Sequence, residues 1–348
     1  MSETAPAISV VLPVHNGMPF LGEALDSLFA QDFTDFEIVL IDDGSTDGTS
    51  EYVDGLAVNE PRLRVVRNGR LGLVGALNFG ITQARAALIA RMDADDRARP
   101  ERLGLQFEAL KAQPGLVAVA GQMAYMDAEG RATGRVSRFP TDTGAVRAAL
   151  EAGRSEVAHP TVLVRREAVL RAGGYRAAYK AAEDLDLWLR LLAFGEIGIG
   201  SEVVLDYRQH PGQVSQTQKL RQWFSTQLAV ATHRLRAEGL TDPTDDLDAP
   251  VDWHDADTRT AMGPRLAPLL DTFAVIDKAL SGELVDVSGA LDTLARARAE
   301  GLAVSRFRQQ ALVRLAKGPG SIRKRLRAVR LAIAENPRRA VRQFFSGS

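Results

Sequence analysis

The chain has 348 residues, of which 45% are hydrophobic and 25% charged, and its formal net charge is −1. These values are ordinary for a globular protein of about two domains, and they exclude disorder, collagen-like repeats and a coiled-coil rod for most of the chain. There is no cysteine, which excludes disulfides, thiolate metal sites and a cysteine nucleophile. A metal ion would therefore bind through Asp, Glu or His.

The N-terminal sequence MSETAPAISVV has no basic region before its apolar residues. The longest uncharged stretch, residues 112–126, contains a Pro-Gly pair. Neither a signal peptide nor a membrane-spanning helix is expected from these features, and the predicted location is the cytoplasm.

Short apolar runs then alternate with segments of helical spacing. The predicted strands are residues 8–14, 36–41, 63–66 and 87–92, and the predicted helices are 20–30, a helix beginning near Gly48, and 73–86. This alternation indicates an α/β fold with a parallel, twisted sheet, which binds ligands at the carboxyl ends of its strands. Further strands are expected over 116–125 and 157–164, a helix over 183–194, and mostly helix beyond about residue 214.

Polar residues follow three of the predicted strands: His15 and Asn16, the pair Asp42 and Asp43, and the group 93–96. The strand period places Asp93 and Asp95 on one face, about 7 Å apart. That spacing suits Mg²⁺ or Mn²⁺ shared with substrate phosphates, and a solvated acidic loop is the alternative. Of Asp42 and Asp43, one can cap a helix while the other binds a ligand.

Glu183 and Asp184 open a predicted helix. They could serve only to complement the helix dipole, or Asp184 could act as a general base. Near a strand end, Arg208 could neutralise a phosphate and His210 could complete the coordination of a metal, although both could equally be surface residues. His159 has the same ambiguity, and Trp188 could stack on a bound ligand or belong to the core.

Seven segments in order resemble glycosyltransferase family 2, the inverting enzymes of GT-A fold, over about residues 7–217. They are ISVVLPVHNG, IDDGSTDGT, GLVGALNFGI, RMDADD with RPERL, HPTVLVRREAVLRAGGYR, EDLDLWLRL and YRQHPGQVS. The resemblance implies a Rossmann-like, mostly parallel sheet flanked by helices. The expected division is a GT-A domain over 1–217, a helix and acidic linker over 218–257, and a helical region over 258–348.

The resemblance also implies roles for single residues. Pro13, Val14, His15, Asn16 and Asp43 would hold the nucleotide base and ribose, with Asp93 at the ribose and metal. Asp95 would be the principal metal ligand, with His210 near the metal and diphosphate, and Asp184 would be the base. Many members have Arg before the Asn of the third segment, whereas Leu77 precedes Asn78 here. Asn78 stays a donor-site candidate, Arg70 is a possible substitute at the phosphates, and Glu183, His159, Trp188 and Arg208 are candidates for acceptor or phosphate contacts.

The implied reaction moves one sugar from a UDP-, GDP- or dTDP-sugar to a hydroxyl of a glycan or lipid-linked acceptor, in bacterial surface polysaccharide or glycoconjugate synthesis. Single transfer is expected because the Gln-x-x-Arg-Trp segment of processive synthases is absent. Two alternatives are a catalytically silent scaffold of an envelope-assembly complex and a sugar nucleotidyltransferase. The latter would need a glycine- and lysine-rich segment after the first strand, and PVHNGMPF contains no basic residue.

Charge is distributed unevenly towards the C-terminus. Residues 242–257 hold seven Asp and are expected to form a solvated linker, whereas residues 306–348 hold twelve Lys or Arg and one acidic residue. An apolar helical stripe is predicted at Ile322, Leu326, Val329 and Ile333, surrounded by Arg323, Lys324, Arg325, Arg327 and Arg330, and followed by Arg338, Arg339, Arg342, Phe344 and Phe345. Residues 321–345 are therefore predicted either to attach the protein to an anionic membrane, at its inner face, or to pack on the catalytic domain. Nucleic acid is not expected as a partner.

Overall fold

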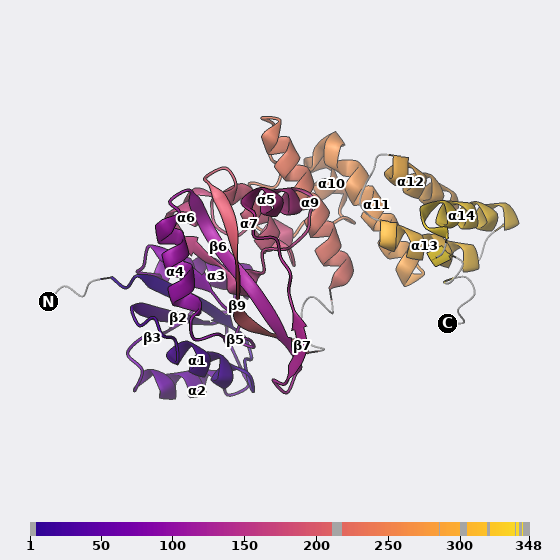
Figure 1. The fold of residues 1–348 in the computed structure, drawn as a ribbon. Coiled ribbons are helices and arrows are strands. Elements are labelled where there is room, and N and C mark those ends of the chain that lie inside the picture. Colours follow the sequence, from indigo (N-terminus) through magenta and orange to yellow (C-terminus); the bar gives the residue numbers. More distant parts are fainter. Residues whose placement is uncertain are drawn as a thin grey trace. The chain divides into compact units, whose positions relative to one another are not determined.

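The computed structural model describes residues 5–210, 218–284, 286–299, 305–318, 321–337, 339–340 and 343. Its contacts divide the chain into two compact units (Figure 1). The first unit holds residues 1–177 and 181–217, and the second holds residues 178–180 and 218–348.

The first unit alternates strands and helices, as the sequence predicts. Its elements are β1 Ile8–Val14, α1 Leu21–Phe29, β2 Phe36–Asp42, α2 Thr49–Ala57, β3 Leu63–Arg67, α3 Gly72–Gln83, β4 Leu88–Arg91, β5 Arg97–Ala98, α4 Arg102–Ala112, β6 Leu116–Met126, β7 Ala132–Val136, α5 Thr143–Glu151, the 3-10 turn η1 His159–Thr161, β8 Leu163–Arg165, α6 Arg166–Arg171, α7 Glu183–Leu191 and β9 Glu196–Arg208.

One sheet runs through this unit in the order β3-β2-β1-β4-β8-β6-β9-β5, with β7 beside β6. β1 is parallel to β2 and β4, and β2 is parallel to β3, so the carboxyl ends of these four strands lie at one edge. β8 is antiparallel to β4 and β6, while β9 is parallel to β6. The α/β class predicted from the sequence is confirmed, and the parallel half of the sheet is the half that the alternating pattern predicts.

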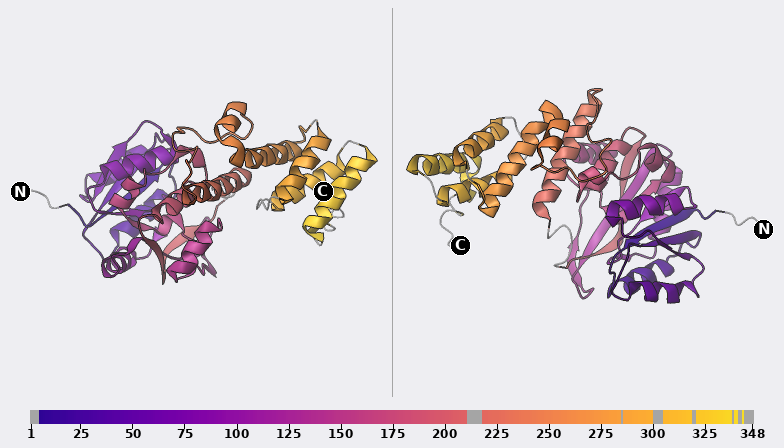
Figure 2. Two further views of the ribbon diagram at one scale, coloured as in Figure 1. Left: turned by 90° about the horizontal axis from the view of Figure 1, so that it is seen from above. Right: turned by 180° about the vertical axis from the view of Figure 1, so that it is seen from behind.

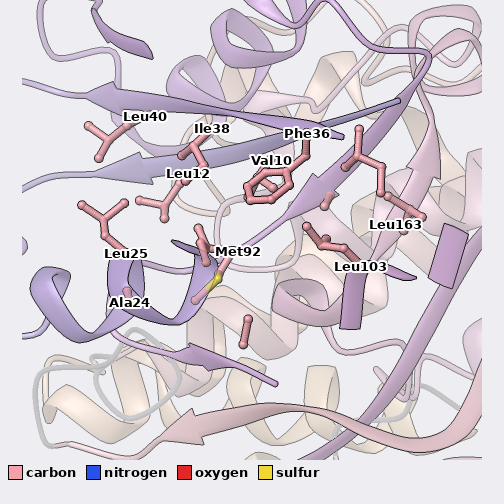
Figure 3. Close-up of a cluster of buried hydrophobic side chains, with 14 of the residues drawn as sticks. Val10, Leu12, Ala24, Leu25, Phe36, Ile38, Leu40, Met92, Leu103 and Leu163 are labelled. Atoms are coloured by element: carbon pink, nitrogen blue, oxygen red, sulfur yellow. The ribbon is translucent and has the colours of Figure 1, made fainter. Parts of the chain in front are cut away.

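The strands β1 and β2 are buried on both faces. Val10, Leu12, Ile38 and Leu40 pack on one face with apolar residues of α1, α2 and α4 (Figure 3). The opposite face receives α3 at Gly80, where an added Cβ would lie 2.7 Å from Val11 Cγ1 and 2.6 Å from Ile41 Cδ1. Because period-two alternation sends successive side chains to opposite faces, every residue of these strands is enclosed.

The expectation of a strand over 157–164 is wrong for most of that range. Residues His159–Thr161 form a 3-10 turn, and the strand β8 covers only Leu163–Arg165. Pro160 explains the break, because it has no backbone N–H to donate to a strand ladder.

The second unit is helical in the residues described. Its helices are α9 Lys219–Ala237, α10 Ala256–Ala261, α11 Gly263–Ser281, α12 Val287–Ala299, α13 Ser305–Lys317 and α14 Ile322–Glu335. α13 and α14 lie side by side in the views of Figure 2, and Nε2 of Gln309 donates to the carbonyl of Asn336 at 2.9 Å. Among the described residues, none of the helices combines the length and apolar character needed to cross a bilayer.

The acidic segment 242–257 differs from the solvated linker expected from its composition. Val251 and Trp253 are buried, and the Trp253 ring meets the edge of Phe224 with 4.8 Å between ring centroids. Asp242 is also buried and forms an ion pair with Arg236. Burial of Val251 and Trp253 and the ion pair of Asp242 with Arg236 hold residues 242–257 against the rest of the second unit.

Candidate active site

The loops after β1 and β2 are joined to each other at the carboxyl edge of the sheet. Asn16 stands in the left-handed region with a φ of 55°. Its Oδ1 accepts the backbone N–H of Thr46 at 2.8 Å, and its own N–H donates to Ser45 Oγ at 3.0 Å. The backbone N–H of Asp43 donates to the carbonyl of Val14 at 2.8 Å. Two loops far apart in sequence therefore form one wall.

Pro13 and His15 belong to the same wall. Pro13 stands opposite Ile41 in the β1–β2 pairing, and His15 is exposed with Nε2 3.5 Å from Nδ2 of Asn16. The structure thus brings the residues from 13 to 16 next to Asp43, as the strand-end argument expects.

Asp42, the last residue of β2, and Asp43, which follows it, have different hydrogen-bond partners. Asp42 is buried, and burial acts to raise its pKa. Hydrogen bonds from Ser50 and Ser45 outweigh the effect of burial, so the pKa of Asp42 is lowered. Asp43 accepts the backbone N–H groups of Leu71 and Gly72 at 2.6 and 2.9 Å, so it fixes the start of α3. Asp42 is held inside, while Asp43 faces the loop before α3.

Three carboxylates gather after β4. Asp93, Asp95 and Asp96 each offer an oxygen, and these oxygens all lie within 4.8 Å of one another. This is closer than the spacing of about 7 Å expected from strand geometry, because β4 ends at Arg91 and the chain turns at Ala94 and Asp95.

Asp96 is the most enclosed of the three, with an exposure of 0%. Its Oδ1 accepts the backbone N–H of Arg208 at 2.9 Å, whereas Oδ2 is buried with no hydrogen-bond partner in the described structure. Burial and the charges of Asp93 and Asp95 raise the pKa of Asp96 well above its usual range. Burial and Asp93 also raise the pKa of Asp95. Such a cluster is unfavourable until a cation meets its charge.

The end of β9 and the two residues after it place two side chains beside this cluster. Nε2 of His210 lies 3.0 Å from Oδ2 of Asp95, and the imidazole packs on Phe20 with 5.3 Å between centroids. Arg208 is buried, and its guanidinium donates to the carbonyl of Asp95 at 2.7 Å and to Oε2 of Glu23 at 2.7 Å. Arg208 therefore braces the aspartate loop, and we do not propose it as a phosphate ligand.

Arg91 connects the cluster to the start of α7. It is buried and forms an ion pair with Asp93. The positive charge of Arg91 acts to lower the pKa of Asp184. Burial and the same charge hold the pKa of His159 well below its usual range. His159 is therefore neutral at pH 7, and its Nε2 lies 2.7 Å from the hydroxyl of Tyr175.

Glu183 and Asp184 stand in the first turn of α7. Burial and the charge of Asp184 raise the pKa of Glu183 to about 7. Burial also raises the pKa of Asp184, against the opposing effects of a 2.8 Å hydrogen bond from the N–H of Leu185 and of Arg91. Each carboxyl group therefore disfavours the ionisation of the other, and the helix N-terminus favours the anion of the pair.

The structure places three other candidates as follows. The amide of Asn78 exchanges two hydrogen bonds of 2.8 Å with the backbone of Tyr175, so it anchors that segment. Trp188 is fully buried and meets the edge of His159, so the core alternative describes it. Arg70 is exposed beside the Asp43 loop, with a φ of 72°.

The sequence argument missed three residues. Strand alternation selects only Asp93 and Asp95, so it does not predict Asp96 as a metal ligand. Asn68 follows β3 at the same edge, and both its amide atoms are buried without a partner in the described part of the chain. Arg91 lies within a predicted apolar strand and is not predicted as a functional residue. A charged residue inside such a run is the sequence feature that could have identified it.

The donor set fits a hard divalent cation. It consists of carboxylate oxygens with one imidazole, and the orphaned Oδ2 of Asp96 supplies an enclosed oxygen without a protein partner. Oxygen donors of this kind suit Mg²⁺ or Mn²⁺ rather than a thiophilic metal.

The first unit is a transferase domain of the GT-A class. Its defining features are the sheet, the wall formed by the loops after β1 and β2, and the carboxylates after β4. The model of glycosyl transferase family 2 matches residues 9–172. The first unit of this chain belongs to that family, and the protein is a glycosyltransferase.

Named relatives agree with the family. The chain is 29% identical to the glycosyltransferase EpsE of Bacillus subtilis over 206 residues, 58% of this chain and 72% of EpsE. It is 27% identical to the O-antigen biosynthesis glycosyltransferase WbnJ of Escherichia coli over 214 residues, 58% of this chain and 80% of WbnJ. The structure of S. aureus TarS 1–349 in complex with UDP-GlcNAc superposes with a TM-score of 0.61 at 17% identity, covering 97% of this chain and 93% of that one. This likeness shows the fold.

Proposed function

We propose that the protein transfers a single sugar from a nucleotide-diphosphate sugar to a hydroxyl group, with a divalent cation and with inversion at the anomeric carbon. The observation that carries this proposal is the convergence of Asp93, Asp95 and Asp96, with one buried oxygen of Asp96 unpartnered. The names of structural neighbours add support, since TarS was solved with UDP-GlcNAc and with UDP.

The donor nucleotide would lie along the wall made by residues 13–16 and Asp43, with Asp93 at the ribose. Asn68 and Arg70 are further candidates there, since one has an enclosed amide without a partner and the other an exposed guanidinium. Asp95, Asp96, Asp93 and His210 would hold Mg²⁺ or Mn²⁺. When bound, the cation offsets the negative charge of the diphosphate leaving group.

Asp184 would act as the general base. The acceptor oxygen forms a bond to the anomeric carbon, the bond from that carbon to the diphosphate oxygen breaks, and the hydroxyl proton passes to Asp184. Nucleoside diphosphate leaves with the electron pair of the broken bond. The position of Asp184 in the first turn of α7 supports this role, because a helix N-terminus favours the ionised carboxylate that a base must present.

The acceptor is proposed to be a glycan or lipid-linked sugar in polysaccharide synthesis at the bacterial surface. The support is the name of WbnJ, which assigns that relative to O-antigen biosynthesis. The same comparisons disfavour a nucleotidyltransferase and a silent scaffold.

A donor screen tests the proposal. Thermal unfolding is followed with UDP, GDP, dTDP or CMP, each with and without Mn²⁺, because a ligand that binds only the native state raises the unfolding temperature. The nucleotide selected is then supplied as its sugar conjugates, with an acceptor glycan. We expect free nucleoside diphosphate and a product of inverted anomeric configuration by NMR. A product that retains the configuration of the donor would refute the single displacement.

A further inference from the structure

Helix α14, Ile322–Glu335, has two apolar faces with different surroundings. Ala328 and Ala332 are buried within the second unit. Ile322, Leu326 and Ile333 remain 73%, 55% and 42% exposed. Three of the four residues of the predicted stripe therefore lie outside the packing of α14 on its neighbours, and the fourth, Val329, is half-buried. Of the residues expected after the helix, Arg338, Arg342, Phe344 and Phe345 lie outside the described part of the chain.

Helical geometry separates these two faces. At 3.6 residues per turn, the three exposed residues fall within about 40° of one another, and the two alanines are centred about 120° away. The small alanines let α14 approach α13, and the large side chains are left on the outside. A stripe of large aliphatic residues in water is unfavourable unless something covers it.

Positive charge surrounds the exposed stripe. Arg323 and Arg330 neighbour it along one side, and Arg325 neighbours it along the other. Arg323 and Arg330 are exposed, and they have no hydrogen bond or ion pair within the described part of the chain. The single acidic residue of α14, Glu335, is already paired with Arg308. No free negative charge therefore offsets these cations on the helix.

We propose that the face of α14 formed by Ile322, Leu326 and Ile333, with Arg323 and Arg330 beside it, docks on an anionic lipid bilayer. The helix would lie in the plane of the interface, with its aliphatic side chains among the acyl chains and its basic side chains at the headgroups. Each basic residue near such a surface strengthens binding about fivefold. Salt weakens this attraction by screening it.

Two other occupants fit the face less well. Single-stranded nucleic acid is bound by cations combined with aromatic side chains that stack on bases, and α14 contains no aromatic residue. A second copy of the chain would bring two strongly positive helices together, and their charges would repel. An anionic bilayer satisfies both the apolar stripe and the cations.

Docking on a bilayer stands apart from the proposed transfer reaction and can be measured without it. If both hold, the acceptor is a lipid-linked sugar presented at the same surface.

Vesicle co-sedimentation of the full chain tests the inference. The wild type should pellet with vesicles of phosphatidylglycerol and phosphatidylcholine at low salt, release at high salt, and stay in solution with phosphatidylcholine alone. The variant Ile322→Ser/Leu326→Ser/Ile333→Ser should bind at least tenfold more weakly. The variant Arg323→Gln/Arg330→Gln should bind about 25-fold more weakly, as two lost charges predict.

Matched controls alter comparable exposed residues on the first unit. Val58, Leu105 and Leu170 are 81%, 46% and 47% exposed, so Val58→Ser/Leu105→Ser/Leu170→Ser removes comparable apolar surface. Lys111→Gln/Arg138→Gln removes two exposed cations. Both controls should bind vesicles like the wild type, and circular dichroism should show the same helicity in every variant.

Several results would overturn the proposal. They are failure of the wild type to pellet, equal weakening by the controls, or retention of binding in the Ser variant. Tight binding of a single-stranded RNA oligomer that is lost in the Gln variant but kept in the Ser variant would instead assign the face to nucleic acid. Dimerisation that is lost in the Ser variant would assign it to a second copy.

Discussion

The imidazole of His210 binds the carboxylate of Asp95 at 3.0 Å, although 115 positions of sequence separate them. The chain just after β9 carries His210 to the loop after β4, and Arg208, the last residue of β9, braces that loop through the carbonyl of Asp95. A carboxylate with an imidazole beside it forms one side of the cluster that we propose for the cation. Substitution of single residues in and near this cluster should change cation binding, sugar transfer or stability in ways that can be measured.

Metal-dependent nucleotide binding should depend on the acidic cluster. Asp95→Asn and Asp96→Asn each remove one anionic oxygen donor while keeping the shape of the side chain. We expect the increase in unfolding temperature given by nucleotide with Mn²⁺ to disappear in both variants. Asp127→Asn, in a half-buried turn outside the cluster, should retain the full increase. An unchanged response in Asp96→Asn would show that the unpartnered oxygen does not serve a cation.

Binding of the cation should release protons. Burial and neighbouring charges raise the pKa of Asp96 and of Asp95, so part of the cluster is protonated at low pH. A cation binds the ionised form, and its affinity should therefore rise with pH. Calorimetric titration with Mn²⁺ in two buffers of different ionisation enthalpy measures the released protons. Affinity that is independent of pH would contradict this prediction.

Asp184→Asn should separate binding from chemistry. The variant is nearly isosteric and cannot accept a proton, so transfer should fall at least about a hundredfold. The affinity for nucleotide and Mn²⁺ should change little, because the proposed donor wall and cluster lie on other loops. Loss of donor binding together with transfer would place Asp184 in the donor site.

Glu183 should make stability depend on pH. Burial and Asp184 raise its pKa in the folded state to about 7, above its ordinary value of 4.5. Between these values the folded state binds more protons than the unfolded chain, so rising pH lowers stability, by about 1.4 kcal/mol per unit. Glu183→Gln should remove this slope, and its advantage over the wild type should reach about 3 kcal/mol above pH 7. Glu167→Gln, at an exposed first-turn position of α6, should follow the wild type in urea unfolding.

Gly80→Ala should destabilise the first unit. The added methyl group would lie 2.6 Å from Ile41 Cδ1 and 2.7 Å from Val11 Cγ1, between α3 and two central strands. We expect a loss of about 1 to 3 kcal/mol by chemical unfolding. Gly55→Ala is the matched control, because a Cβ at Gly55 in α2 meets nothing within 4 Å. This control should gain up to about 1 kcal/mol from helix propensity.

The sequence by itself determined the parallel half of the sheet. Doubly buried strands read as continuous apolar runs, and β1 occupies the predicted range 8–14. It also determined which loops share an edge, because the carboxyl ends of parallel strands must meet there. Asp43, Asp95 and Asn16 could be selected as candidates on that basis alone.

The tertiary structure decided what each side chain does at that edge. Asp96 and Asn68 gained significance only from enclosure without partners, and Arg208 became a brace because Glu23 and the Asp95 carbonyl surround it. On α14, periodicity gave the apolar stripe, but the packing of Ala328 and Ala332 decided that the stripe stays exposed. Burial and hydrogen bonding depend on segments distant in the chain, and local spacing contains no information about which segments those are.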